Sequence, residues 1–186
     1  MPVEGTHALS GRGHLGVDLA TTAWGEPDPA EPRAMSLGLR IAWAQRVLAT
    51  TPFAEPWAIA AAAMAIAHER WLLDRPFGDT TAHRAATVVG RAAISAVSFE
   101  SFLAAVPTNG RWALVDVHEP DDLWRAQVRW WKRVDEDGAD LLRGPGFSDR
   151  VVVGAVLVCA ADAWRVRAAL SCAAGRDGAV TFDLLA

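Results

Sequence analysis

The segment that most constrains the fold is WAIAAAAMAIAHERWLLD, residues 57–74. At helical spacing its apolar residues leave no polar face before His68. A helix that is hydrophobic all round has to be surrounded by other elements. Pro56 suits the first turn of such a helix, and Pro76 ends it. The segment therefore predicts a central, buried helix with further helices packed around it.

Helical patterns recur along the rest of the chain. One apolar stripe within residues 34–50 is typical of an amphipathic helix; it consists of Leu37, Ile41, Ala44 and Leu48. Asp79 and Ser98 belong to the residue types that cap helix N-termini, so we expect a helix after each of them. The predicted helices are residues 13–24, 34–50, 57–74, 80–97, 99–106, 121–138 and 148–175.

This pattern predicts an all-α protein, an irregular bundle of about six to eight helices with short connections. We expect residues 1–12, which are polar and rich in glycine, to be disordered, and residues 13–186 to form a single helical domain. The remaining segments are expected to be connections or extended pieces: a loop at 25–32, a turn at 107–110, an extended stretch at 111–120 and an extended tail at 179–186.

Tryptophan and basic residues alternate in DLWRAQVRWWKRVDEDG, residues 122–138. On a helical wheel the apolar residues gather on one side; they are Leu123, Trp124, Val128, Trp130, Trp131 and Val134. The basic residues fall on the other side together with acidic ones, whereas a nucleic-acid platform needs aromatic rings and cations on one exposed surface. We therefore predict a core-packing helix, with protein docking as the alternative, and Gly138 as its C-terminal glycine.

The last predicted helix, 148–175, holds the most apolar run of the chain. We expect this helix to be mostly buried and kinked at Gly154. Asp162 and Arg165 interrupt the apolar run short of the roughly 20 residues that a membrane span needs. The helix therefore predicts a soluble protein.

Composition and cysteine usage fit a cytoplasmic protein. The 186 residues are 52% hydrophobic and carry a formal net charge of −4, which argues against a general nucleic-acid binder and against direct membrane insertion. The start of the chain lacks the basic and apolar regions of a signal peptide. Cys159 and Cys172 would point to different faces of one helix, so we expect two buried free thiols.

Chemical motifs are scarce. The sequence contains no GxSxG, CxxC or HxxxH spacing, so we expect no enzyme activity and no cofactor. One alternative is a small helical-bundle metal-dependent enzyme or ligand binder. Its metal would be held by His68, Glu69 and His83, from two consecutive helices.

Three stretches together resemble a known family: residues 36–69, 121–143 and 151–174, with the phrases LGLRIAWA, DLWR followed by RWW, and DAWRVRAAL. They resemble the helical C-terminal portion of actinobacterial proteins labelled as V-type ATPase central-stalk subunits of the C type, called d in eukaryotes. The resemblance implies an all-α, non-catalytic coupling protein. It further implies rotor or stalk subunits as partners, and a location at the membrane periphery through them.

The leading expectation is therefore a cytoplasmic, non-catalytic docking protein, with a general protein-interaction adaptor as a further alternative. Tryptophan dominates the energetics of many protein interfaces, so tryptophans are the first candidates for docking. The candidate docking residues are Trp24, Trp57, Trp71, Trp112 and Trp164.

Overall fold

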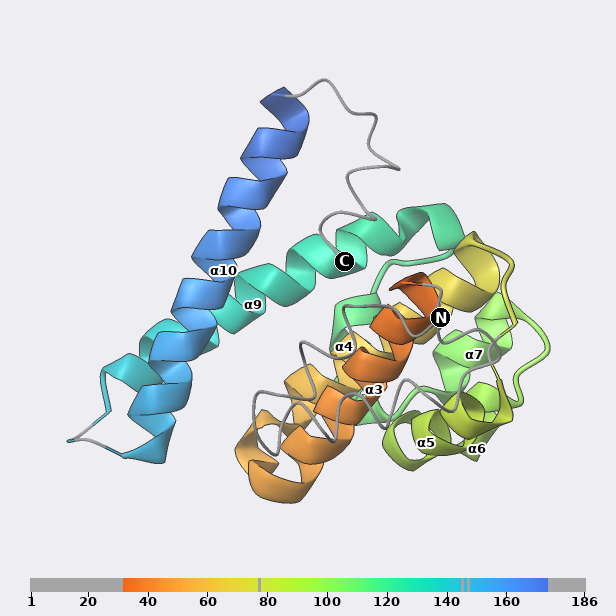
Figure 1. Cartoon of the computed structure of the whole chain (residues 1–186), viewed down its shortest axis with the longest axis horizontal. Helices are drawn as coiled ribbons and strands as arrows, with labels where there is room; N and C mark the ends of the chain where they lie inside the picture. The colour runs from red at the N-terminus through yellow and green to blue at the C-terminus, as the bar shows by residue number, and fades with distance from the viewer. Residues whose placement is uncertain (1–31, 77, 145, 147, 174–186) are drawn as a thin grey trace, which may run out of the picture. The chain divides into compact units, whose positions relative to one another are not determined.

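The computed structural model describes residues 32–76, 78–144, 146 and 148–173, and every regular element among them is helical (Figure 1). The prediction of an all-α fold is confirmed. The chain divides into two compact units, the first ending at Leu123 and the second beginning at Trp124. The predicted segments 1–12, 13–24 and 179–186 lie outside the described residues.

The first unit is built from short helices and single turns. In chain order these are α3 (Pro32–Thr50), η1 (Pro52–Ala54), α4 (Glu55–Ala67), η2 (His68–Leu72), α5 (Asp79–Val89), α6 (Arg91–Ile94), α7 (Phe99–Ala105), α8 (Thr108–Arg111), η3 (Trp112–Leu114) and η4 (Pro120–Asp122).

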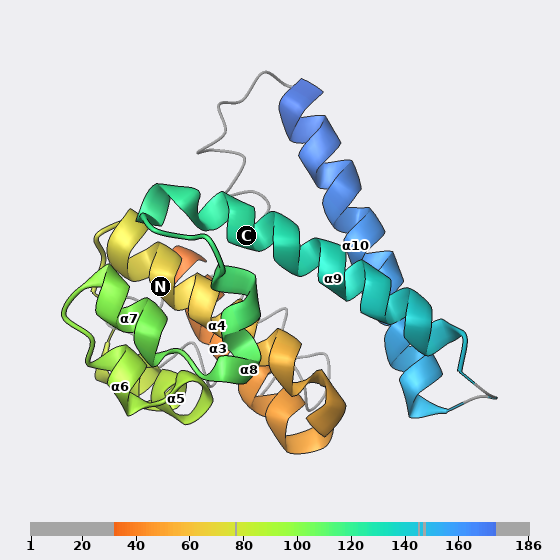
Figure 2. The same cartoon turned by 180° about the vertical axis from the view of Figure 1, so that it is seen from behind.

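The centre of the first unit is α4, as its all-apolar sequence predicts. Nine of its 13 residues are buried, and it contacts α3, α5 and α8 (Figure 2). From α3, the predicted stripe supplies Leu37, Ile41 and Ala44 to the core. At its C-terminal end α4 passes into η2, a single π-helical turn.

The predicted helix 80–97 is wrong in its length, because the helix is interrupted at Gly90. α5 ends at Val89, and Gly90 adopts a φ of +87°, a conformation that L side chains rarely adopt. The short α6 follows. Asp79 is the first residue of α5, which Gly78 precedes as N-cap. Ser98 does cap α7, where its hydroxyl accepts a hydrogen bond from the Ser101 amide at 3.1 Å.

Two predicted connections are also helical. The turn expected at 107–110 is largely the short helix α8, and the stretch expected to be extended at 111–120 contains η3 and no strand. Gly110 lets α8 pack closely on α4, since a Cβ on Gly110 would lie 2.9 Å from the Cβ of Ile59. Arg111 then donates hydrogen bonds to the carbonyl oxygens of Ala104 and Val106, at 2.6 and 2.8 Å. These bonds tie α8 to the end of α7.

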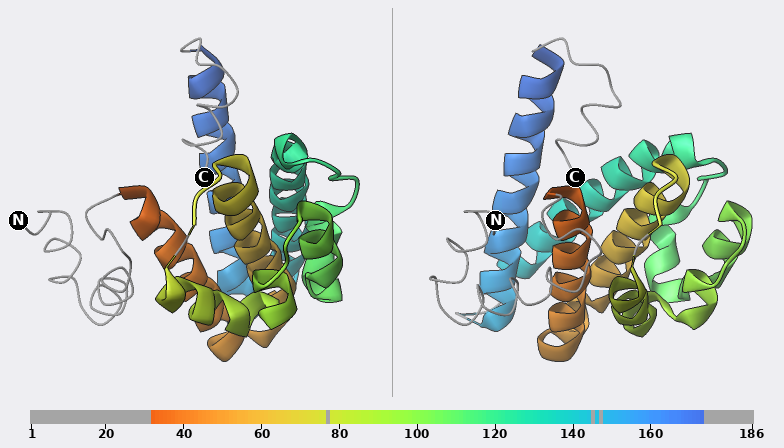
Figure 3. Two further views of the ribbon diagram at one scale, coloured as in Figure 1. Left: turned by 90° about the vertical axis from the view of Figure 1, so that its right-hand side faces the viewer. Right: turned by 45° about the vertical axis from the view of Figure 1, so that its right-hand side comes forward.

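The second unit is a helical hairpin of α9 (Leu123–Leu142), from its second residue onward, and α10 (Asp149–Ala173). Figures 1 and 3 show the helices crossing near their connection and the last turns of α10 diverging from α9. No helix among the described residues is long and apolar enough to cross a membrane.

Three predictions about the hairpin need correction. Gly138 lies inside α9, buried, and does not end it. α10 is mostly exposed where a buried helix is predicted, because only one of its faces meets α9. Its cysteines, Cys159 and Cys172, are free but exposed.

Candidate docking surface

One face of α10 packs closely on α9. A Cβ on Gly138 would lie 3.0 Å from the Cβ of Leu157, and one on Gly154 would lie 2.8 Å from the Cβ of Leu141. The helices therefore approach each other so closely that Gly154 has no room for a side chain, and a side chain on Gly138 would require its neighbours to shift by a few tenths of an ångström. The buried residues of α10 belong to this side of the helix, and they are Gly154, Ala161 and Ser171.

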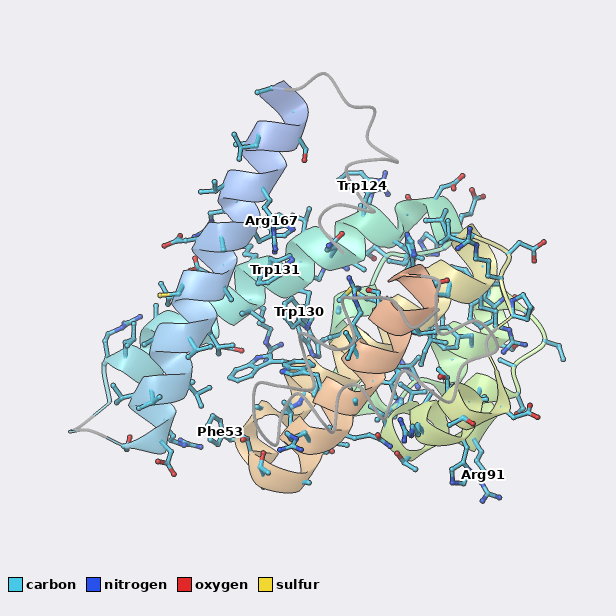
Figure 4. The ribbon with its side chains drawn as sticks, viewed as in Figure 1. Phe53, Arg91, Trp124, Trp130, Trp131 and Arg167 are labelled. Atoms are coloured by element: carbon cyan, nitrogen blue, oxygen red, sulfur yellow. The ribbon has the colours of Figure 1, made fainter. Side chains whose placement is uncertain are left out.

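Beyond the glycine crossing, aromatic and charged side chains join the two helices. The rings of Trp131 on α9 and Trp164 on α10 stack, with centroids 5.7 Å apart and planes inclined by 19°. Figure 4 shows Trp131 in the angle between the two helices. Arg165 forms ion pairs with Asp135 on α9 and, at 2.8 Å, with Asp162 on its own helix. These hydrogen bonds raise the pKa of Arg165 above its usual value.

The opposite face of α10 is apolar and exposed along its whole length. We name it the exposed seam, and it consists of Val152, Val156, Cys159, Ala163, Val166, Leu170 and Ala173. Val156 and Leu170 keep 62% and 65% of their surface exposed. An apolar strip of this length on a protein surface is typical of an interaction site.

The spacing of the exposed seam is regular. Its residues follow one another by four and three positions in alternation, from Val152 to Ala173. This alternation averages 3.5 residues, which is the repeat by which one α-helix packs lengthwise against another. At about 1.5 Å per residue the seam is about 32 Å long. The arrangement suits a helical partner.

The tryptophan-rich helix α9 fits its prediction only in part. Trp130 and Val134 are buried as expected, and Trp131 is partly buried. Trp124 and Val128 are exposed, by 52% and 45%, which corrects their assignment to the core. Figure 4 labels Trp124 near the start of α9, where the guanidinium of Arg125 lies 5.3 Å from its ring centre. This cation–π attraction is a contact that Trp124 makes outside the core.

Of the predicted docking tryptophans among the described residues, one is buried and three are partly buried. Trp57 is buried and meets Phe53 edge-on, at a centroid distance of 6.4 Å. Trp71 packs against Phe102, with centroids 4.6 Å apart. Trp112 and Trp164 are partly buried, and Trp24 lies outside the described residues. The residues of the exposed seam were not among the sequence-based candidates.

The alternative metal site is not assembled. His68 is buried at the start of η2, whereas His83 is exposed on α5. Among the described residues, no group of three or more His, Cys, Asp or Glu side chains is placed to hold a metal ion. His68, Glu69 and His83 therefore do not come together as a ligand set.

Comparison with known proteins adds no relative: no family model, no curated protein and no solved structure matches this chain.

Proposed function

We propose that this chain is a non-catalytic docking protein that assembles with another polypeptide through the exposed seam of α10. One observation supports the proposal above the others. A helix otherwise packed on α9 presents seven apolar or small residues to solvent, in the repeat used for helix–helix pairing. Burial of such a face against a partner lowers the free energy, because apolar surface is removed from water.

The contacts between α9 and α10 leave this face of α10 exposed. The glycine crossing and the stack of Trp131 on Trp164 fix α10 from its other side. Docking therefore requires no rearrangement of the contacts between the two helices. A preformed surface loses little conformational entropy when it binds.

The more specific form of the proposal is a subunit similar to the central stalk of a V-type ATPase. Its support is the resemblance of residues 36–69, 121–143 and 151–174 to that family. Rotor or stalk subunits would then be the partners, and the chain would lie at the periphery of a membrane through them. The general docking proposal does not depend on this identification.

A comparison of matched baits tests the proposal. The tagged full-length chain is recovered from its native host after mild crosslinking, and captured polypeptides, including untagged copies of the chain itself, are identified by mass spectrometry. The variant Val156→Glu/Val166→Glu places two charges on the seam, where both side chains are exposed and the fold should tolerate them. Val97→Glu is the matched control, because Val97 is 93% exposed and lies in the first unit.

We expect the wild-type chain and the Val97→Glu control to capture the same specific partner, and the seam variant to lose it. Rotor or stalk subunits in the wild-type eluate would support the V-type ATPase form. Equal capture by the wild-type chain and the seam variant would contradict the docking proposal.

A further inference from the structure

We propose that the partner on the exposed seam is a second copy of this chain, and that two copies of α10 pair in parallel and in register. This inference rests on the proposed function, because it names the occupant of the same face.

The side chains of the seam suit close helix pairing. Six of its seven residues are valine, alanine or cysteine, and Leu170 is the largest. Small and β-branched side chains let two helix backbones approach closely and still interdigitate. In an in-register pair each seam residue meets its own equivalent, so the surface is self-complementary, as a twofold interface requires.

Charges beside the seam select the second copy and its orientation. On one side the seam is flanked by Ala155, Asp162 and Ala169, and on the other by Val153, Ala160 and Arg167. The first flank thus carries one acid and the second flank one base, and the two residues are five positions apart. In a parallel, in-register pair a residue on the first flank lies beside the residue five positions later on the other helix. Asp162 of each copy then meets Arg167 of the other.

The antiparallel alternative lacks this complementarity. When two copies of α10 pair along the seam in opposite directions, each flank lies against the same flank of the other copy. Asp162 would then lie beside Asp162 of the second copy, which is unfavourable, and Arg167 would gain no acidic partner. The charge pattern therefore favours the parallel pair.

Both charged groups are available to a partner. Arg167 is exposed, and no hydrogen bond or ion pair joins it to another residue of the described part of the chain. Asp162 is exposed and pairs with Arg165. Because Arg165 also pairs with Asp135, it keeps an acidic partner when Asp162 turns toward the second copy.

The parallel pair makes a specific prediction about the two thiols. Cys159 is a seam residue near the middle of α10, so the two copies of Cys159 would face each other across the twofold axis. Cys172 is equally free and exposed but lies off the seam. In the centred antiparallel pair Cys159 would face Ala163. Crosslinking through Cys159 therefore reports both the face and the direction of pairing.

The test combines measurement of the molecular mass in solution with oxidative crosslinking of the full-length chain. Because most seam side chains are small, we expect a reversible dimer with a dissociation constant on the order of 1–100 µM. Sedimentation velocity across this range should show monomer converting to dimer. Mild copper–phenanthroline oxidation should give a disulfide-linked dimer with the wild-type chain and with Cys172→Ser, but not with Cys159→Ser.

Two further variants address the seam and its flanks. Val156→Glu/Val166→Glu should be monomeric at every concentration. Arg167→Glu brings two acids together on each side of the pair and should weaken association roughly tenfold. Arg150→Glu makes the same charge change on α10 away from the seam and should leave association unchanged.

A wild-type chain that stays monomeric would overturn the second copy as occupant, whether the seam is then covered by residues 1–31 or 174–186 or by another protein. A dimer that survives Val156→Glu/Val166→Glu, or that crosslinks equally well through Cys172, would overturn the parallel seam. The docking proposal is judged separately. It survives a monomeric result if the wild-type bait still captures a partner that the seam variant loses, and it fails if both capture the same proteins.

Discussion

Gly138 on α9 and Gly154 on α10 face each other where the two helices cross. A Cβ on Gly138 would lie 3.2 Å from the carbonyl oxygen of Gly154, and one on Gly154 would lie 2.8 Å from the carbonyl oxygen of Gly138. Each glycine costs about 1 kcal/mol of helix propensity relative to alanine. The close crossing offsets that cost, and it orients α10 so that the exposed seam points away from α9.

Gly154→Ala should destabilise the hairpin. The added methyl group meets backbone atoms that cannot rotate away, so a steric cost toward the upper end of roughly 1–3 kcal/mol outweighs the gain in helix propensity. We expect the free energy of unfolding to fall by about 1–2 kcal/mol in guanidinium titrations followed by tryptophan fluorescence. The neighbouring exposed substitution Ala155→Ser should change it by less than about 0.5 kcal/mol. A stabilised Gly154→Ala chain would contradict the close crossing.

Substitutions at Trp164 should distinguish what its ring contributes to stability from what its N–H group contributes. The ring stacks on Trp131, while its Nε1 is buried with no hydrogen-bond partner among the described residues. Trp164→Phe keeps an aromatic ring and removes the unpaired donor, so we expect a loss of less than about 1 kcal/mol. Trp164→Ala removes the stack and should cost about 2–3 kcal/mol. Equal losses in thermal unfolding would contradict this prediction.

Arg70 should not be replaceable by lysine. From η2 its guanidinium donates two hydrogen bonds of 2.6 Å, to the carbonyl oxygens of Ile94 and Ala96, and it also lies 4.7 Å from the ring centre of Trp71. A lysine ammonium cannot reproduce this forked geometry. Arg70→Lys should lower the free energy of unfolding by about 1–2 kcal/mol, against no measurable change for the exposed control Arg91→Lys. Matching values for both variants would argue against the two bonds.

Sequence patterns predicted the first unit well where local chemistry decides the structure. The apolar composition of α4 requires burial, and the Ser98 cap starts α7. The break at Gly90 was missed because a glycine inside a helical pattern is compatible with both a continued helix and an end. Its φ of +87° is visible only in the folded chain.

The exposed seam was missed for a different physical reason. α10 carries small or apolar residues on the face that meets α9, such as Gly154 and Ala161, as well as on the seam. Apolar residues on both faces leave little contrast around the helix, and such a pattern is normally a sign of burial. The alternation of four and three from Val152 to Ala173 was the available signal, but identifying it requires knowing which face α9 covers.

Arg40 and Glu69 provide a last test, inside the first unit. The guanidinium Nη2 of Arg40 is buried with no hydrogen-bond partner among the described residues. Burial lowers the pKa of Arg40 below its usual value, and the charge of Glu69 acts in the opposite direction. A cation whose pKa is lowered by folding costs stability at every pH below that pKa. The cost is therefore fully present at neutral pH, and it decreases only as the pH rises from the lowered pKa to the usual one.

Arg40→Met should therefore stabilise the chain at neutral pH, by about 1 kcal/mol, because an apolar side chain of similar length removes the desolvated charge. Glu69→Gln should destabilise the wild-type chain, since it leaves the Arg40 charge without its compensation, and should do so less in the Arg40→Met background. Thermal unfolding of the four chains gives the coupling between the two residues, with the exposed Arg46→Met as the matched control. A large loss of stability in Arg40→Met would mean that the guanidinium makes a bond that outweighs its desolvation.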